Sequence, residues 1–391
     1  MFSRTQVDRY PAKMVSRLAD RLVERYASNA TRILDPFCGS GAVLVAASRM
    51  GIPVTGVDVN PIAALFSLVK LKGFDPQNAI KLANDLVHSA RHSAQPLPIE
   101  WSAKHYWFTP ATLDKLERFR GAAKEMLPRR SNAGMAVLLS FSLCIRLCSK
   151  ADQRSPKPFI SKDAKKTRRG LHFDPYVIMP MVLEDLAQTM PRAAHHHASR
   201  FVLSDITSNS FALGSLVKHS HVVTSPPYIN AQDYFRNFKL ELYALEGLLP
   251  FRVEDIRTRF IGTDRGDLLA GIPAVILAAN YEMLPSLRTL NRQFPRLAEV
   301  VHRYLFDMDR AFSNIRDSLE KKGRFVLVCG DNLIGGIRIR TWQVLRQMLE
   351  QQGFVLFDSF SDPIESRMLA PKRCGHKGLI KEEVVSAFER V

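Results

Sequence analysis

The sequence predicts an α/β fold: a doubly wound, mostly parallel, seven-stranded Rossmann-like sheet that carries a large, mainly helical insertion. Short β-prone runs alternate with helical runs near both ends of the chain, the pattern of a parallel sheet covered by helices. One strand passes through a glycine-rich turn into a helix, and 391 residues suffice for a large domain and an inserted one. We expect the large domain to comprise residues 1–71 and 200–391, and the insertion residues 72–199.

The first strand–turn–helix unit begins after residue 30. Thr31–Leu34 is largely β-prone, the turn reads Asp35-Pro36-Phe37-Cys38-Gly39-Ser40-Gly41, and residues 42–47 read as a helix. Glycines let a ligand approach the backbone closely, and the free N–H groups at a helix start favour a carboxylate. The alternative is an ordinary strand–helix turn without a ligand.

The second unit places an acidic residue at the tip of its strand. Pro53–Val57 is predicted to be a strand that ends at Asp58, and Asn60-Pro61 precedes an apolar helical run, Ile62–Leu71. Asp58 comes 17 residues after Gly41. An acid at that place and spacing holds ribose hydroxyls in doubly wound folds. The alternative is a helix N-cap.

Two further strands end in polar residues. Phe201–Asp205 is predicted to be the third strand, with Asp205 at its tip, and a surface-turn aspartate is the alternative for that residue. His221–Thr224 is predicted to be the fourth, followed by Ser225-Pro226-Pro227-Tyr228. The prolines stiffen this loop because they fix φ. Its alternative interpretation is a proline-rich turn after a buried strand.

The remaining elements complete the predicted sheet. In order along the chain, we expect an amphipathic helix ending near Tyr26, a helix over Tyr304–Leu319, a turn at Lys321–Gly323, and strands over Arg324–Cys329, Phe354–Phe360 and Glu383–Phe388.

Basic residues are concentrated between 146 and 169, where prolines favour a loop. This run is the first candidate for contact with nucleic-acid phosphates, and residues 243–300 are a second candidate recognition segment; a solvated loop is the alternative. The candidate phosphate ligands are Lys150, Arg154, Lys157, Lys165, Lys166, Arg168 and Arg169. The neighbouring aromatic residues Trp101, Tyr106, Trp107 and Phe108 are interpreted as core rather than as base-stacking groups.

Composition indicates a globular protein with a polyanionic partner. The formal net charge is +17, the isoelectric point is about 9.8, and 46% of residues are apolar. Nucleic acid is the first candidate partner and a membrane surface the second. The longest apolar run, Gly134–Ile145, is too short to span a bilayer, and no signal peptide is visible, so a cytoplasmic location is expected.

The five cysteines suggest a reducing compartment, and we expect no metal site. Cys144 and Cys148 are spaced as neighbours on a buried helix, while Cys374 and His376 have no matching pair elsewhere. The run His195–His197 follows Pro191 and is interpreted as a loop.

The turn at 35–41 and the loop at 225–228, together in one basic chain, resemble the cofactor and catalytic loops of the DNA amino-methyltransferases. These enzymes use S-adenosylmethionine to methylate an exocyclic base nitrogen. A serine before Pro-Pro-Tyr is the form usual in the cytosine-N4 group. The likeness extends to Tyr10–Met14 and to residues 230–242. The long stretch between the second and third strands departs from the family's standard motif orders.

The resemblance implies a set of site residues. The implied cofactor-binding residues are Tyr10, Lys13, Asp35, Pro36, Phe37, Cys38, Gly39, Gly41, Asp58, Val59, Asn60, Asp205 and Thr224. The implied catalytic residues are Ser225, Pro226, Pro227 and Tyr228, and Arg236 is an implied DNA ligand. Ser225 and the Pro226 carbonyl would accept protons of the target amine, and Tyr228 would stack on a flipped base.

The expected function is therefore methyl transfer from S-adenosylmethionine to the N4 amine of cytosine in double-stranded DNA, by base flipping and direct displacement. No Pro-Cys dipeptide occurs, which argues against the cysteine-dependent chemistry of cytosine C5 enzymes. Adenine-N6 methylation of DNA, guanine-N2 methylation of tRNA and a catalytically inactive DNA-binding relative are the alternatives. A cognate restriction endonuclease is a possible partner.

Overall fold

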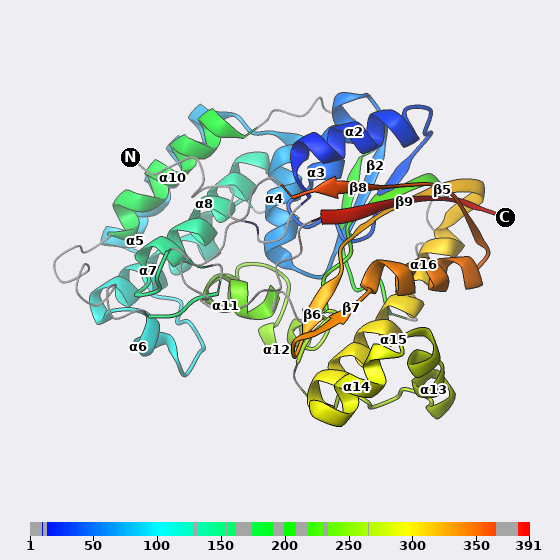
Figure 1. Cartoon of the computed structure of the whole chain (residues 1–391). Helices are drawn as coiled ribbons and strands as arrows, with labels where there is room; N and C mark the ends of the chain where they lie inside the picture. The colour runs from blue at the N-terminus through cyan, green and yellow to red at the C-terminus, as the bar shows by residue number, and fades with distance from the viewer. Residues whose placement is uncertain are drawn as a thin grey trace.

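The computed structural model describes residues 10, 14–128, 131–153, 155, 157–160, 174–190, 199–208, 218–229, 234–264, 266–364 and 382–391. Its centre is a seven-stranded sheet with the strand order β3-β2-β1-β4-β5-β9-β8 (Figure 1). All neighbours among β1 to β5 are parallel, and β9 is antiparallel to both β5 and β8. The strands are β1 (Ile33–Asp35), β2 (Val54–Asp58), β3 (Arg200–Leu203), β4 (His219–Thr224), β5 (Leu319–Cys329), β8 (Phe354–Pro363) and β9 (Glu382–Arg390). The predicted fold class is confirmed.

The central strands are apolar on both faces because helices cover both. Along β5, Phe325 and Leu327 enter one hydrophobic cluster, while the intervening Val326 and Val328 enter another. Helices α2 (Ser16–Ala27) and α3 (Ala42–Arg49) pack on the face of Val326. Helices α15 (Pro295–Ser318) and α16 (Thr341–Gln351) pack on the opposite face.

The helices of the insertion share one hydrophobic core with the element that follows β2. They lie to one side of the sheet (Figure 1). They are α5 (Pro76–His92), α6 (Lys104–Trp107), α7 (Pro110–Met126), α8 (Asn132–Cys148) and α10 (Pro175–Thr189). Helix α8 packs against α4 (Pro61–Lys72) and α11 (Tyr234–Leu245), and α5 and α10 pack against α8. The expected apolar helix forms most of α8, which is almost wholly buried. No helix in the described ranges is long and apolar enough to cross a membrane.

Two smaller groups of elements flank the sheet. The first is α12 (Val253–Arg257), α13 (Ala274–Met283) and α14 (Ser286–Gln293), which lead into α15. The second is a hairpin of β6 (Asn332–Ile334) and β7 (Ile337–Ile339) directly after β5. The hairpin contacts α14, and neither it nor α14 was foreseen as a separate element.

The predicted turn at Lys321–Gly323 is wrong as a boundary, because β5 already begins at Leu319. Leu319 pairs with His219 and Arg324 with His221, so four residues of β5 face a single residue of β4. Lys322 has a φ of 60°, the left-handed conformation that such a bulge requires. The predicted helix also begins earlier, at Pro295, because a proline suits the first helical turn.

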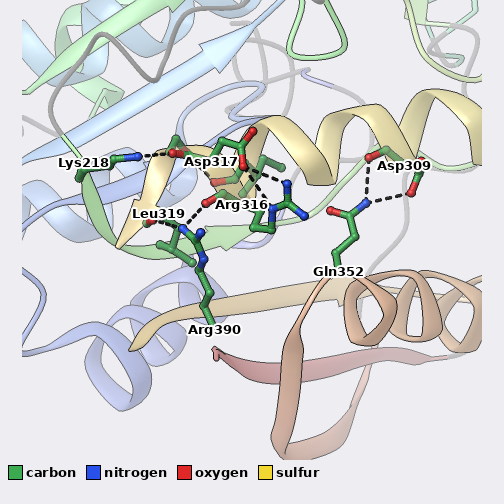
Figure 2. A network of polar contacts seen from close by, with 9 residues as sticks. Lys218, Asp309, Arg316, Asp317, Leu319, Gln352 and Arg390 are labelled. Carbon is green, nitrogen blue, oxygen red and sulfur yellow. Dashed lines mark hydrogen bonds and ion pairs between the residues drawn. The ribbon is translucent and has the colours of Figure 1, made fainter. Parts of the chain in front are cut away.

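Polar contacts fix these elements together at the edge where the parallel strands begin (Figure 2). Arg390, at the end of β9, donates to the carbonyl oxygens of Arg316 and Leu319. Gln352, just after α16, donates to the carboxylate of Asp309 on α15 at 2.9 Å. Loops and polar side chains occupy the opposite edge of the sheet, where the parallel strands end.

Candidate active site

A cavity with about 830 Å³ of open space, including solvent-facing volume, lies where β1 to β4 end. In parallel α/β sheets, ligands bind at this edge. Asp35 ends β1, Asp58 ends β2, Asp205 follows β3, and the loop after β4 begins at Ser225. The lining is Tyr10, Met14, Asp35, Pro36, Phe37, Cys38, Gly39, Ser40, Ala42, Val43, Asp58, Val59, Ser204, Asp205, Ile206, Ser225, Pro227, Tyr234, Arg259, Phe260 and Ile261.

Two glycines shape the turn between β1 and α3. Gly39 has a φ of 49° and Gly41 a φ of 80°, values that side chains rarely allow. A Cβ on Gly39 would lie 2.9 Å from the Tyr10 ring, and one on Gly41 would lie 2.9 Å from the hydroxyl of Ser67. Gly41 is the N-cap of α3. The glycines therefore let the turn fit beneath Tyr10, with the first N–H groups of α3 beside the cavity.

Helix α4 holds the same turn from the other side. The buried Lys70 ammonium donates to the Ser40 carbonyl at 2.9 Å, and the Ser67 hydroxyl donates to the Gly39 carbonyl at 3.1 Å. Both carbonyls are thus turned toward α4. The Ser40 hydroxyl is buried and has no hydrogen-bond partner among the described residues.

Asp58 links the turn to the start of α4. Its carboxylate accepts hydrogen bonds from the backbone N–H groups of Gly39 and Asn60, each at 2.9 Å. Burial raises the pKa of Asp58 to about 6, although these hydrogen bonds favour the ionised form. Asn60, not Asp58, caps α4 by accepting from the N–H of Ile62 at 3.0 Å. The helix-cap alternative for Asp58 is therefore wrong.

Asp35 joins the turn to β4. Its carboxylate accepts from the hydroxyl of Thr224 at 2.7 Å and from the N–H of Phe37 at 3.3 Å. Burial raises the pKa of Asp35 to about 7. Thr224 is fully buried and immediately precedes Ser225, so this bond sets where the following loop begins.

The loop after β4 presents alternate residues to the cavity. Ser225 and Pro227 line it, whereas Pro226 and Tyr228 are buried behind it. The Tyr228 hydroxyl donates to the carboxylate of Glu383 on β9. Burial, followed by the negative charge of Glu383, raises the pKa of Tyr228 well above its usual range. In this structure the Tyr228 phenol is therefore protonated and bonded to Glu383. Its ring lies behind the cavity surface and does not form part of it.

The third acidic tip, Asp205, lies on the cavity wall. Its carboxylate accepts from the N–H of Thr207 at 2.9 Å and from the Thr207 hydroxyl at 2.7 Å. Ile206 beside it lines the same wall. These bonds fix the turn after β3 and leave carboxylate lone pairs for a ligand.

The structure brings most implied cofactor residues together and moves some behind the cavity. Those that line it are Tyr10, Asp35, Pro36, Phe37, Cys38, Gly39, Asp58, Val59 and Asp205. Gly41, Asn60 and Thr224 instead support the lining, as caps and hydrogen-bond partners. The Asn60 amide contacts the Tyr10 hydroxyl at 3.4 Å. Lys13 lies outside the described residues.

Sequence reasoning missed the wall formed by Arg259, Phe260 and Ile261. These residues follow α12, within the segment 243–300 that was considered only for DNA recognition. It also missed Tyr234, the first residue of α11, which is half-buried and lines the cavity. The pattern that could have revealed Phe260 and Ile261 is an apolar pair within a polar, arginine-rich stretch.

The predicted phosphate ligands lie mostly outside the described residues, which exclude Arg154, Lys165, Lys166, Arg168 and Arg169. Lys150 donates to the backbone carbonyl of His105 at 3.0 Å, and Lys157 and Arg236 are partly exposed.

Arg146, the first residue of the basic run, is not a surface residue, although counting charges places it with the candidate phosphate ligands. Arg146 is buried in α8 and donates to the carbonyl of Asn237 at 3.1 Å, so it is a structural residue. Among the neighbouring aromatic residues, Trp107 and Phe108 are buried, as the core interpretation predicts, whereas Tyr106 is exposed.

Two of the residues considered for metal binding, Cys144 and Cys148, lie within the described part of the chain. Cys144 and Cys148 are buried with their sulfur atoms 3.6 Å apart, and the described residues contain no group of three or more potential metal ligands. His195–His197, Cys374 and His376 lie outside the described ranges.

Comparisons with known proteins agree with the geometry. Residues 2–65 match a family model described as DNA methylase. The chain is 32% identical over 88 residues to the type II methyltransferase M.MjaII of Methanocaldococcus jannaschii, covering 22% of this chain and 17% of the relative. It is 22% identical over 386 residues to the type II methyltransferase M.AvaI of Nostoc sp., covering 86% of this chain and 76% of the relative.

A shorter match involves an RNA-modifying protein. The chain is 44% identical over 52 residues to the tRNA (guanine(10)-N2)-dimethyltransferase of Methanothermobacter thermautotrophicus, covering 13% of this chain and 16% of the relative. The matched stretches therefore span less than a fifth of both archaeal relatives, and about three quarters of the Nostoc protein.

Proposed function

Because the chain belongs to the DNA amino-methyltransferase family, we propose that it transfers a methyl group from S-adenosylmethionine to the N4 amine of cytosine in DNA. DNA methyltransferases of this family use S-adenosylmethionine as methyl donor. The observation that carries the proposal is the placing of Ser225 and Pro227 on the wall of the same cavity as the glycine turn. A methyl donor held by the turn would thus lie next to the loop that receives the base.

The lining fits the proposed cofactor. Asp58 and Asp205 offer carboxylate oxygens to ribose hydroxyls and to the adenine amine. The N–H groups at the start of α3 and the buried Ser40 hydroxyl are donors suited to the methionine carboxylate. Three carboxyl groups, Asp35 included, also favour the positive sulfonium and ammonium groups when ionised.

The loop residues supply positioning rather than covalent catalysis. When bound, the cofactor supplies a methyl group whose carbon–sulfur bond breaks as the new carbon–nitrogen bond forms. The cytosine amine is a weak nucleophile because its lone pair is conjugated with the ring. The Ser225 hydroxyl and the Pro226 carbonyl would accept hydrogen bonds from the amine, which favours a nitrogen whose lone pair is out of conjugation. The methylated nitrogen would then release one proton to solvent and become a neutral amine. Holding the amine dry and in line would provide the remaining acceleration.

The choice of cytosine N4 over adenine N6 rests on Ser225. A serine before Pro-Pro-Tyr is the form usual in the cytosine-N4 group, and Ser225 is the residue that lines the cavity. Adenine-N6 methylation is the alternative within the family.

The basic run between residues 146 and 169 would hold DNA near this site. We propose that residues 150–169 grip phosphates and that the insertion at 72–199, with 243–300, contributes to DNA recognition. A cognate restriction endonuclease is a proposed partner, since two of the relatives are named type II methyltransferases.

The test uses purified protein with S-adenosylmethionine carrying a labelled methyl group. The protein is incubated separately with mixed-sequence duplex DNA and with tRNA, and the modified nucleosides are separated by chromatography and mass spectrometry. We expect label in N4-methylcytosine from DNA, and much slower labelling by the Ser225→Ala variant. Label in N6-methyladenine would shift the proposal to adenine, and label in methylguanosine of tRNA would favour the activity named for the archaeal tRNA relative. Cofactor binding without transfer to either nucleic acid would indicate an inactive relative.

A further inference from the structure

The loop at 225–229 is fixed by residues from three elements that are far apart in the sequence. Its start is held from β1 by the bond between Asp35 and Thr224. Its middle is held from β9, and its end from the segment just after β5. The latter two contacts involve Glu383 and Asn332, to which neither the sequence nor the proposed function has given a role.

Glu383 reaches the loop because β9 is reversed. The parallel strands end at the cavity edge, whereas the antiparallel β9 begins there, and Glu383 is its second residue. Its carboxylate accepts the hydrogen bond of the Tyr228 hydroxyl across 155 positions of sequence. The pKa of Tyr228 is raised well above its usual range, so the phenol stays protonated and can donate throughout the neutral pH range.

Asn332 fixes the end of the loop with a defined amide orientation. Its amide oxygen accepts from the Thr341 hydroxyl at 2.8 Å. Its amide nitrogen therefore faces the other way and donates to the carbonyl of Ile229 at 3.2 Å. Asn332, Thr341 and Ile229 are all buried, so water does not compete for these bonds. With both ends of the loop fixed, the tyrosine ring is the part whose place depends on Glu383.

We propose that Glu383 is a positioning residue for methyl transfer, which holds Tyr228 behind the cavity and thereby fixes the loop that carries Ser225 and Pro227 on the cavity wall. This proposal rests on the proposed function, because it assigns Ser225 on that loop to the target amine. Glu383 acts through the tyrosine hydroxyl and does not touch the reacting amine. Without the carboxylate, the buried hydroxyl would lose its acceptor and the ring would leave its present rotamer to find another.

The test is a double-mutant cycle on the Tyr228–Glu383 bond, read as single-turnover methyl transfer at saturating S-adenosylmethionine and DNA. Glu383→Ala and Tyr228→Phe each remove the bond, whereas Glu383→Gln keeps an acceptor for the phenol. We expect the first two to slow transfer by about 10- to 100-fold and the glutamine variant to retain most of the rate. The double variant Tyr228→Phe/Glu383→Ala should be no slower than the worse single variant, because both remove one interaction.

Controls separate this role from a general structural one. Glu382→Ala removes the exposed neighbour of Glu383 and should leave the rate unchanged. The affinity for S-adenosylmethionine, measured by calorimetry, should be the same in all variants, because neither Tyr228 nor Glu383 lines the cavity. Multiplicative losses in the double variant, or a full rate in Glu383→Ala, would overturn the proposal. If Glu383→Ala does not fold, a full rate in Tyr228→Phe would overturn it equally.

A second measurement does not depend on methyl transfer. The protein is labelled with 3-fluorotyrosine, and the fluorine resonance of Tyr228 is assigned by its absence in Tyr228→Phe. We expect this resonance to move in Glu383→Ala and to stay close to its original position in Glu383→Gln and Glu382→Ala. An unmoved resonance in Glu383→Ala contradicts the positioning role. If the resonance moves in Glu383→Ala but the wild-type protein methylates no nucleic acid, the contact between Tyr228 and Glu383 stands and the proposed function is refuted.

Discussion

Replacing Asp58 with alanine tests the proposed cofactor cavity at a residue that bonds two segments of its wall. The carboxylate binds the N–H groups of Gly39 and Asn60, each at 2.9 Å, and it also lines the cavity. A hydrogen bond to a charged acceptor contributes about 1.5–3 kcal/mol. Ribose hydroxyls would bind the same carboxylate, so we expect the substitution to weaken S-adenosylmethionine binding by about 1–3 kcal/mol, or about 5- to 150-fold.

The Asp58→Asn variant separates the charge from the shape of the side chain. An amide can accept one backbone N–H with its oxygen, but its NH₂ group then faces the other N–H. Cofactor affinity should therefore fall in this variant as well. Because burial raises the pKa of Asp58 to about 6, the wild-type carboxyl is protonated, and a poorer acceptor, below that pH. We expect wild-type affinity to fall by up to about tenfold per pH unit below 6. The asparagine variant should lack the Asp58 part of this fall.

Folding stability should change in the opposite direction. A carboxyl whose pKa is raised on folding stabilises the fold most below its unfolded value near 4, and that contribution is lost as pH rises to about 6. The wild type should therefore lose stability through Asp58 between about pH 4 and about pH 6, and the asparagine variant should lack that loss.

The assay is calorimetry with S-adenosylmethionine between pH 5 and 8, together with thermal unfolding of the free proteins. Asp20→Asn on the exposed face of α2 serves as the matched control, since its side chain is 46% exposed. Unchanged affinity in folded Asp58→Ala and Asp58→Asn would remove Asp58 from the site. A pH dependence that persists unchanged in Asp58→Asn would assign it to Asp35, whose pKa is about 7.

Three further predictions concern the strand, the loop and the basic run. Burial lowers the pKa of His219 to about 4, so its contribution to stability is present above about pH 6.5 and is lost as the pH falls toward 4. In denaturant titrations, His219→Gln should therefore lose less stability between about pH 7 and about pH 5 than the wild type loses. Ser225→Ala and Tyr228→Ala should each slow single-turnover transfer strongly while leaving the affinity for S-adenosylmethionine nearly intact, and wild-type rates would place the chemistry elsewhere. A quadruple alanine variant should weaken DNA binding for all sequences and flatten the slope of log affinity against log salt by about one to three units, with the preferred methylation site unchanged. Its four positions are Lys165, Lys166, Arg168 and Arg169. An untouched salt slope would mean that this stretch is only solvated.

The sheet and the cavity edge were predictable because they depend on local patterns. Each short β-prone run ended in a polar residue, and in a parallel sheet these ends necessarily meet. Asp35, Asp58 and Asp205 consequently arrive on one cavity although 170 positions separate the first from the last. Residues that support the cavity from behind, such as Asn60 and Thr224, could be placed near it but not distinguished from its lining.

Contacts that depend on strand order were not predictable in the same way. The segment around Glu383 was recognised as a strand, but its reversal, which turns Glu383 toward Tyr228, is a property of the whole sheet. The hairpin of β6 and β7 was missed because each strand has only three residues. Such short runs are too brief for a period-two pattern to be distinguished from a loop.

Counting charge also failed where a local pattern contradicted it. Arg146 belongs to the apolar helical run that continues to Cys148, and this continuity favours a helix position over a loop. Inside the core its guanidinium is satisfied by backbone carbonyls, and burial lowers its pKa. Basic residues therefore indicate an exposed segment only after the apolar helical pattern has ended, which here is at Cys148.

The insertion, which we propose contributes to DNA recognition, is connected mechanically to the cavity through α4. Helix α4 carries Ser67 and Lys70, which hold the carbonyls of the glycine turn. The same helix packs against α8 in the core that the insertion shares with α11. Interiors at this packing density transmit displacement, because side chains have few vacant positions into which to relax. A shift of the insertion on binding a polyanion would therefore act on α4, and through Ser67 and Lys70 on the turn that lines the cavity.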